Sequence, residues 1–250
     1  MKTEKVAIIT GSGRGIGAAT AKLFAENAYA VCINYKSNAE AANEIATSIT
    51  NQGGRCISVQ ADVSLEKDVI NLFQLVDSEF GHLSTLVNNA GILKEQSRLD
   101  EMSADRINSV LINNVTSYFL CSREAVKRMS SNYGRAGGTI VNVSSGASRR
   151  GSPNEYIDYA SSKGAIDTLT TGLSLEVADE GIRVNCVRPG LIHTGIHVDG
   201  GEPNRIDRLK SKIPMQRGGQ PEEVAEAILW LASDKSSYVT GSFIDLSGGL

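Results

Sequence analysis

Residues 6–20 read VAIITGSGRGIGAAT, an apolar run followed by a glycine-rich turn and the start of a helix-compatible segment. Glycines permit a tight turn and let the backbone N–H groups of a helix N-terminus approach a pyrophosphate. The stretch therefore predicts a strand, a dinucleotide-binding turn and a helix, with ordinary strand-to-helix packing as the alternative. Its glycines fit two spacings of such a turn, Gly13-x-Gly15-x-x-Ala18 and Gly11-x-x-x-Gly15-x-Gly17.

The rest of the chain repeats this alternation of apolar runs and helix-compatible segments. The runs of strand length are VAIIT (6–10), AVCINY (30–35), CISVQ (56–60), STLVNN (84–89), TIVNVSS (139–145), IRVNCV (182–187) and SFIDL (242–246). Helices are predicted between them, over about 16–27, 38–51, 65–80, 103–130, 155–179 and 221–232. Near-continuous Val and Ile content suits strands covered on both faces of a parallel sheet. These features predict an α/β fold, a doubly wound, seven-stranded parallel sheet with helices on both faces.

No linker, charge block, low-complexity segment or internal repeat divides the sequence, so we expect a single domain over residues 1–250. The least regular part, about 189–220, has three prolines and six glycines. Long irregular segments in compact domains are commonly functional, so this one is predicted to be a substrate loop.

The bulk composition argues against several classes of function. A formal net charge of −3 gives no support for a nucleic-acid partner, because phosphate binding favours a basic face. The N-terminus, MKTEKVAIIT, has too short an apolar run for a secretory signal or a membrane span. The four cysteines are scattered without a C-x-x-C pair, which argues against disulfides. We expect a cytoplasmic protein without nucleic-acid or membrane partners.

The end of the second predicted strand bears on the choice of dinucleotide. NAD-binding proteins usually carry an acid there for the ribose 2′-hydroxyl, whereas this chain has Asn34, Tyr35 and Lys36. Lys36 and Arg14 of the glycine turn could meet a 2′-phosphate through charge-assisted hydrogen bonds. The alternative is that both are solvated surface cations. We expect NADP(H) in preference to NAD(H).

A tyrosine and a lysine stand four residues apart in DYASSKGA (158–165), within a predicted helix. Residues i and i+4 share one helix face, so Tyr159 and Lys163 can bring their polar ends together. A surface pair in which both side chains reach water is the alternative. Tyr156 precedes Tyr159, but Ala160 lies four residues beyond it, so only Tyr159 has a lysine partner.

Because this pair stands together with further motifs, the sequence resembles the short-chain dehydrogenase/reductase family. The likeness covers essentially the whole sequence. The motifs, in the family's order and spacing, are Thr10-Gly11-x-x-x-Gly15-x-Gly17, Asp62-Val63, Asn88-Asn89-Ala90-Gly91, Asn114, Ser145, Tyr159-x-x-x-Lys163, and Pro189-Gly190 with Thr194. The resemblance implies a Rossmann-type fold. The subgroup it resembles includes glucose dehydrogenase-like and 3-oxoacyl-carrier-protein reductase-like enzymes, which are generally homotetrameric.

The resemblance also implies the site residues. The catalytic ones would be Asn114, Ser145, Tyr159 and Lys163. Together with the residues after the second strand, the expected cofactor-binding set is Gly11, Ser12, Arg14, Gly15, Ile16, Gly17, Asn34, Tyr35, Lys36, Asp62, Val63, Asn89, Ala90, Gly91, Tyr159, Lys163, Pro189, Gly190, Ile192 and Thr194. The family's N-V-T-x-Y-F register selects Asn114 over Asn113, and its serine doublet most often uses the second serine.

These residue types suit hydride transfer to a carbonyl, in which negative charge builds on oxygen. Tyr159 would act as acid/base, while Lys163 would lower the pKa of its phenol and hold the nicotinamide ribose. Ser145 would donate to the carbonyl oxygen, and Asn114 would support a water that relays protons. We expect an oxidoreductase of small-molecule carbonyls and secondary alcohols (EC 1.1.1.-).

Within that class the substrate stays open. Polar residues of the 189–220 segment favour a sugar or polyol, and a 3-oxoacyl-carrier-protein reductase is the alternative. A non-catalytic, cofactor-sensing protein would be expected to lack the tyrosine, the lysine or the serine, and all are present. His193 and His197 stand at i and i+4 without a carboxylate between them, and we expect no metal site.

Overall fold

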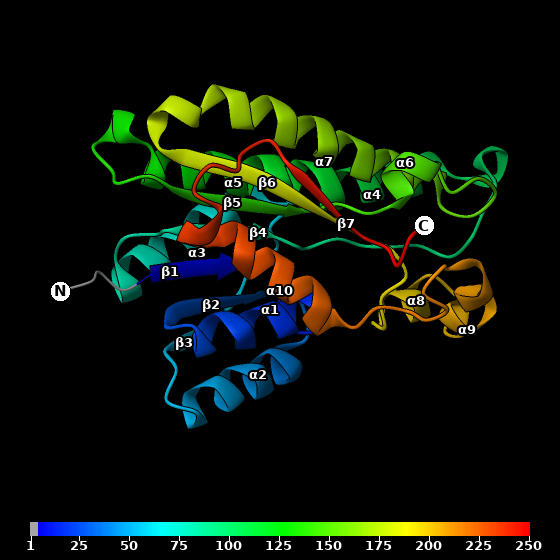
Figure 1. Ribbon diagram of the computed structural model, residues 1–250, viewed down its shortest axis with the longest axis horizontal. Helices are drawn as coiled ribbons and strands as arrows, with labels where there is room; N and C mark the ends of the chain where they lie inside the picture. The colour runs from blue at the N-terminus through cyan, green and yellow to red at the C-terminus, as the bar shows by residue number, and fades with distance from the viewer. Residues whose placement is uncertain (1–4) are drawn as a thin grey trace.

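The computed structural model describes residues 5–250; residues 1–4, with which the expected domain begins, lie outside the described residues. Seven parallel strands form one sheet in the order β3-β2-β1-β4-β5-β6-β7 (Figure 1). They are β1 (Lys5–Ile9), β2 (Tyr29–Tyr35), β3 (Cys56–Gln60), β4 (Thr85–Asn88), β5 (Gly138–Val143), β6 (Ile182–Pro189) and β7 (Phe243–Leu246). The predicted doubly wound, seven-stranded parallel sheet is confirmed.

Both faces of the sheet are buried, which explains the unbroken apolar runs. In β1, Val6 and Ile8 pack into one hydrophobic core, whereas Ala7 and Ile9 pack into the other. Successive side chains of a strand point to opposite faces, so a strand that is covered twice is mostly apolar along its whole length.

Helices cover the two faces in separate groups (Figure 1). One core is completed by α1 (Gly15–Glu26), α2 (Ala39–Asn51) and α10 (Pro221–Ala232). The other is completed mainly by α3 (Glu66–Phe80) and α5 (Ser117–Met129), and α7 (Ile157–Glu176) also packs on that side. The last helix, predicted over 221–232, begins at Pro221, whose missing N–H would have no partner at a helix start.

The helix predicted over 103–130 is interrupted where the sequence pattern gave no sign of it. A helix α4 (Ala104–Leu111) continues into a π-helical turn at Ile112–Thr116 before α5 begins. Asn114 lies fully buried in this turn. Its side-chain Oδ1 accepts from the Ile92 N–H at 2.7 Å and its Nδ2 donates to the Ile92 carbonyl at 3.0 Å. Such π-turns often occur at functional sites.

The segment at about 189–220 is more regular than predicted. It contains the short helices α8 (Ile196–Asp199) and α9 (Arg205–Leu209), which project beside the edge toward which the strands point (Figure 1). Arg205 pairs with Glu202 at 2.6 Å and also with Glu155, 50 residues earlier in the chain. These ion pairs fix the segment against the loop that precedes α7.

No helix within residues 5–250 is long and apolar enough to cross a membrane. All four cysteines are free thiols, as expected, and burial raises the pKa of the Cys56 thiol to about 12.

Candidate active site

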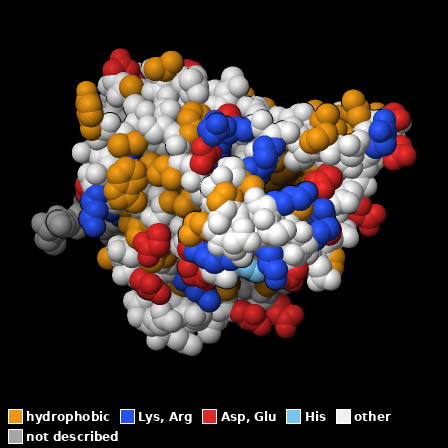
Figure 2. Space-filling view, turned by 45° about the vertical axis from the view of Figure 1, so that its right-hand side comes forward, with side chains coloured by type: hydrophobic (Ala, Val, Ile, Leu, Met, Phe, Trp, Pro, Cys, Tyr) orange, Lys and Arg blue, Asp and Glu red, His pale blue; other side chains and the backbone are white. Residues whose placement is uncertain are grey.

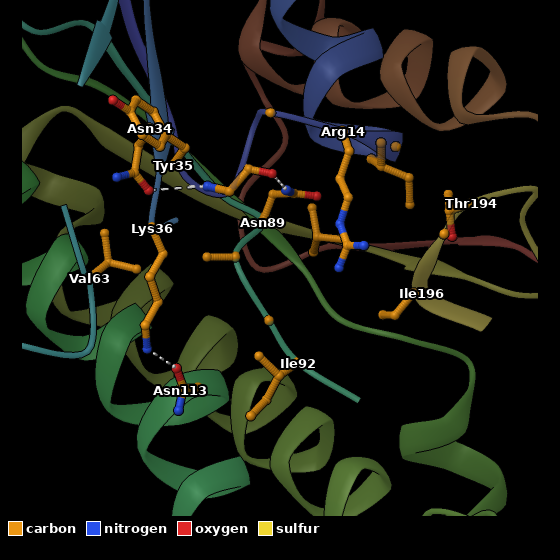
Figure 3. A pocket seen from close by; sticks show the side chains of 18 of the residues that line it. Arg14, Asn34, Tyr35, Lys36, Val63, Asn89, Ile92, Asn113, Thr194 and Ile196 are labelled. Atoms are coloured by element: carbon orange, nitrogen blue, oxygen red, sulfur yellow. Dashed lines mark hydrogen bonds between the residues drawn. The ribbon is translucent and has the colours of Figure 1, made fainter. Parts of the chain in front are cut away.

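A cavity of about 560 Å³ opens at the carboxyl edge of the sheet (Figure 3). Ligands of open α/β sheets bind at this edge, because the loops that follow the parallel strands converge there. The expected site residues that line the cavity are Gly11, Arg14, Gly15, Ile16, Asn34, Tyr35, Lys36, Asp62, Val63, Asn89, Ala90, Gly91, Ser145, Tyr159, Lys163, Pro189, Gly190, Ile192 and Thr194. Three other expected residues, Ser12, Gly17 and Asn114, are buried and do not line it.

The glycine turn after β1 is held tightly against the loop after β4. Gly11 has a φ of +63°, and a Cβ on it would stand 2.9 Å from the Ala90 Cα. A Cβ on Gly17 would stand 2.6 Å from the Asn89 side-chain nitrogen, which donates to the Gly11 carbonyl at 3.1 Å. Gly17 is therefore required by packing, while the N-terminus of α1 faces the cavity with the partial positive charge of its free N–H groups.

Ser12 and Asn34 brace this turn from the side of β2. The buried Ser12 hydroxyl donates to the Ile9 carbonyl at 2.7 Å and accepts from the Asn34 N–H at 3.1 Å. The Asn34 side chain accepts from the Gly11 N–H at 3.2 Å, one of the contacts drawn in Figure 3. Because the Ser12 hydroxyl already makes these two hydrogen bonds, its side chain supports the glycine turn and does not face the cavity.

The two cations expected to meet a 2′-phosphate both carry protein counter-ions. Lys36 Nζ lies 2.7 Å from an Asp62 carboxylate oxygen and 3.5 Å from Asn113 Oδ1. Burial alone would raise the pKa of Asp62, but hydrogen bonds from Lys36 and Ser64 hold it below its usual value. Arg14 pairs with the Asp199 carboxylate.

The pair of Arg14 with Asp199 joins the glycine turn at the cavity to α8. Acidic and basic side chains gather together over this face of the molecule (Figure 2). Neither Arg14 nor Lys36 is therefore a solitary surface cation.

Two hydroxyls meet at the other end of the cavity. Ser145 follows β5 and Tyr159 lies in the first turn of α7, and a hydrogen bond from Ser145 lowers the pKa of the Tyr159 phenol. Burial is the larger influence and leaves that pKa raised above its ordinary value. Ser144 is committed elsewhere, because its hydroxyl donates to the Lys163 carbonyl at 3.0 Å.

Lys163 is 3% exposed, and burial lowers the pKa of its amine to about 8. Its Nζ lies 5.7 Å from the centre of the Tyr159 ring, but it donates to the Val143 carbonyl at 2.8 Å and to the Tyr118 hydroxyl at 3.2 Å. The sequence led us to expect that Lys163 lowers the pKa of Tyr159. In this structure the influence that lowers that pKa comes from Ser145, and the Lys163 ammonium donates to Val143 and Tyr118 instead.

Tyr156, which had been weighed against Tyr159, and His197, one of the two histidines weighed as a metal pair, have contacts unrelated to those roles. Tyr156 is buried outside the cavity, where its hydroxyl donates to the Gly200 carbonyl at 3.0 Å. His197 lines the cavity, with Nε2 3.0 Å from the Ile192 carbonyl. Within residues 5–250, no group of three or more His, Cys, Asp or Glu side chains is arranged to hold a metal ion.

A sequence model of the family described as enoyl-(acyl carrier protein) reductase matches residues 11–250, which include the glycine turn and the tyrosine–lysine pair. The chain belongs to the short-chain dehydrogenase/reductase family. It is accordingly an oxidoreductase of alcohol and carbonyl groups in small molecules, at the level of EC 1.1.1, and it binds NAD(P).

Relatives of this short-chain dehydrogenase/reductase match it over nearly their full length. It is 62% identical over 244 residues to the uncharacterized oxidoreductase YgfF of Escherichia coli, covering 98% of this chain and 99% of that one. It is 39% identical to glucose 1-dehydrogenase 2 of Bacillus subtilis, covering 99% and 95%. The crystal structure of 3-ketoacyl-(acyl-carrier-protein) reductase from Brucella melitensis, complexed with NADH, superposes with a TM-score of 0.90 at 31% identity, covering 98% and 97%.

The cavity of this short-chain dehydrogenase/reductase is also lined by residues outside the expected site set. They include Gly13, Ser37, Asn38, Ala41, Ala61, Ile92, Asn113, Val143, Ser144, Gly195, Ile196 and His197. The sequence selected Asn114 over Asn113 as the site residue, but both residues make contacts around the cavity. Asn113 faces the cavity beside Lys36, and Asn114 clamps the backbone of Ile92. Tyr118 stands in the N-V-T-x-Y-F stretch, but the sequence did not indicate its contacts, because its partners are 25 and 45 residues away.

Proposed function

We propose that the protein transfers a hydride between NADP(H) and a carbonyl or secondary alcohol, with Tyr159 as the acid/base. The observation that carries this proposal is the meeting of the Ser145 and Tyr159 hydroxyls in the wall of the cavity, one helical turn from the buried Lys163 ammonium. A tyrosine, a serine and a lysine in this arrangement supply a proton donor, a second hydrogen-bond donor and a positive charge at one point.

The cavity fits a dinucleotide on its own geometry. Added Cβ atoms on Gly11 and Gly17 would collide with the surrounding chain, and the free end of α1 points at the space beside them. In our proposal the pyrophosphate lies on this cradle, with the adenine against Asp62 and Val63 and its ribose beside the loop after β4. The carboxamide would bind at the segment after β6, which contributes Pro189, Gly190, Ile192 and Thr194.

A bound nicotinamide supplies the hydride. Ser145 and Tyr159 would hold the substrate oxygen between their hydroxyls, and their hydrogen bonds strengthen as negative charge develops there. Because burial raises the pKa of Tyr159, the phenol is protonated at neutral pH and can give its proton to that oxygen. In the oxidative direction the same phenol oxygen would have to take the proton back.

Lys163 and Asn114 would act behind these two hydroxyls. With a pKa of about 8, Lys163 is mostly an ammonium at neutral pH and can donate to the ribose hydroxyls of the nicotinamide. Asn114 spends its side-chain amide on the backbone of Ile92 and on the Ser162 hydroxyl. Its part in a proton relay would therefore come through the backbone of the π-helical turn.

The preference for NADP(H) is proposed from the residues after β2. NAD-binding proteins usually have an acidic residue after the second strand, whereas this chain has Lys36 there and no carboxylate. A 2′-phosphate would have to take over the ammonium of Lys36 from Asp62 and the guanidinium of Arg14 from Asp199. A phosphate carries nearly two charges and three acceptor oxygens, so it competes well for both cations.

A sugar or polyol is the substrate class that we favour. The polar side chains of the 189–220 segment do not carry this choice, because Asp199 is engaged by Arg14, and Glu202 by Arg205 and Arg208. The support is the 39% identity with a glucose 1-dehydrogenase over nearly the full length. The alternative, a 3-oxoacyl-carrier-protein reductase, is supported by the superposition with the Brucella enzyme.

We further propose that residues 1–250 form one domain, that 189–220 is its substrate loop, and that the enzyme is a cytoplasmic homotetramer. Support for association comes from large apolar side chains exposed on α4, α5, α7 and the π-helical turn, namely Leu111, Ile112, Phe119 and Leu175. Sedimentation analysis measures the assembly, and a monomer at micromolar concentration would contradict it.

Replacement of Tyr159 by phenylalanine tests the function. We expect turnover to fall by about 10²–10⁴-fold, the usual contribution of general acid–base catalysis. NADPH affinity should stay near that of the wild type, because the phenol is not needed to hold the dinucleotide. The assay follows NADPH absorbance with sugars, polyols, steroids, quinones and acetoacetyl thioesters. A variant that keeps most of its activity would show that another group is the acid.

A further inference from the structure

The Lys163 ammonium contacts a tyrosine that is not among the expected site residues. Tyr118 lies in the first turn of α5, and its side chain is 1% exposed. Its hydroxyl lies 3.2 Å from Lys163 Nζ and 2.9 Å from the Val143 carbonyl, to which Nζ also donates at 2.8 Å. Nζ stands over the same ring, 5.0 Å from its centre.

The chemistry of the ammonium, the phenol and the carbonyl decides which group donates each hydrogen bond among them. An ammonium has no lone pair, and the carbonyl has no proton, so the single phenolic proton of Tyr118 goes to Val143. The hydroxyl lone pairs are then left for Lys163. Two of the three ammonium N–H bonds are thereby occupied by protein acceptors at the inner wall.

Among residues 5–250 the third N–H has no acceptor, so it is the donor left for a ligand in the cavity. Lys163 lines the cavity, and its Nζ lies 3.6 Å from the place where a Cβ would stand on Gly91. The ammonium therefore approaches the loop after β4 with one donor free.

We propose that Tyr118 is a positioning residue, whose hydroxyl holds the Lys163 ammonium so that one N–H faces the bound nicotinamide ribose. This inference rests on the proposed function, in which Lys163 holds that ribose. Tyr118 touches neither substrate nor cofactor; it acts through Lys163. A phenylalanine would fill the same space and still offer its ring face to the cation, but it would leave the ammonium with one acceptor fewer.

Titration of Lys163 reports this arrangement. The titratable groups around it are Tyr159 and Asp167 on α7, Tyr118 on α5 and Cys186 on β6. Burial already lowers the pKa of Lys163 to about 8, and loss of an acceptor disfavours the ammonium further. The pKa of Lys163 therefore falls in Tyr118→Phe.

The experiment measures the dissociation constant of NADPH by nucleotide fluorescence from pH 6 to pH 10, without substrate. In the wild type, affinity should weaken as pH rises through about 8, where Lys163 loses its charge. In Tyr118→Phe we expect that midpoint to move down by about one pH unit, since a hydrogen bond to a charged group is worth roughly that much. The decline of carbonyl turnover at alkaline pH should likewise begin about one pH unit lower in the variant than in the wild type.

Tyr29→Phe is the matched control. Tyr29 is also buried, and Lys5 Nζ lies over its ring at 5.8 Å from the centre, but it stands at the start of β2, away from the cavity. This variant should keep the wild-type midpoint. A Tyr118→Phe variant with an unchanged midpoint overturns the proposal, even if its melting temperature falls, because the hydroxyl would then only fill the core.

Lys163→Met separates this inference from the proposed function. If Tyr118 acts through Lys163, adding Tyr118→Phe to Lys163→Met leaves NADPH affinity within about twofold, as expected for a fully coupled pair. A further large loss overturns the positioning role. If Lys163→Met alone leaves both affinity and turnover intact, the proposed function is wrong, and the inference is wrong with it.

Discussion

Replacement of Lys36 by alanine tests cofactor recognition, and the structure sets the size of the effect. In the free protein Lys36 pairs with Asp62 at 2.7 Å, with side chains 58% and 20% exposed. An ion pair this exposed contributes only about 0.2–1 kcal/mol, so the melting temperature should hardly change. A charge-assisted hydrogen bond to a phosphate is worth about 1.5–3 kcal/mol. The phosphate contact minus the lost ion pair gives Lys36 a net contribution of about 1–2 kcal/mol to NADPH binding. This corresponds to roughly 5- to 30-fold in affinity.

The assay is the kcat/KM of each coenzyme with one fixed substrate, at low and high salt. We expect kcat/KM to fall by about 5- to 30-fold for NADPH and to stay within about twofold for NADH, with the difference shrinking as salt screens the contact. The double replacement with Arg14→Ala should widen the gap further. Lys22→Ala is the control, because Lys22 is exposed on α1 and outside the cavity. Equal losses for the two coenzymes would refute recognition of a 2′-phosphate.

The remaining predictions concern ion pairs around the site. Arg106→Ala leaves the Asp158 carboxylate, 3% exposed beside the start of α7, without its partner at 2.8 Å. Urea unfolding should show a loss of about 3–5 kcal/mol, the usual result of breaking a buried pair, and a loss below about 1 kcal/mol would contradict it. Hydrogen bonds from Arg208 and Arg205 lower the pKa of Glu202 to about 2. Its stabilising effect is therefore complete above its ordinary pKa and disappears as pH falls toward about 2. The melting-temperature difference between wild type and Glu202→Gln should follow that course, and a difference independent of pH would show that the ion pairs contribute nothing.

The sheet could be predicted from sequence because its cause is local. Each strand needs apolar side chains on both faces, and that requirement is written in consecutive residues, as in β1 and β2. The positions around the cavity could be predicted for a related reason. Most motif residues follow strand ends, and parallel strands bring those ends to one edge.

The features that the sequence did not reveal have causes far away along the chain. The π-helical turn accompanies the contact of Asn114 with Ile92, and the α8–α9 segment is fixed by Glu155, across 50 residues. A helical period carries no trace of such partners. The pKa of Tyr159 also depends on burial, which is a property of the whole fold.

The fit of Gly17 against Asn89 has a consequence for how tightly this enzyme can bind a dinucleotide. Asn89 donates to the Thr10 and Gly11 carbonyls, and the Asn34 side chain accepts from the Gly11 N–H. Ser12 in turn accepts from the Asn34 N–H, so the glycine turn is held in shape before any ligand arrives. A flexible loop would forfeit about 1–2 kcal/mol of ordering entropy for each residue that it fixed on binding. A preorganised turn forfeits little of this, so most of the free energy of its N–H contacts remains as affinity.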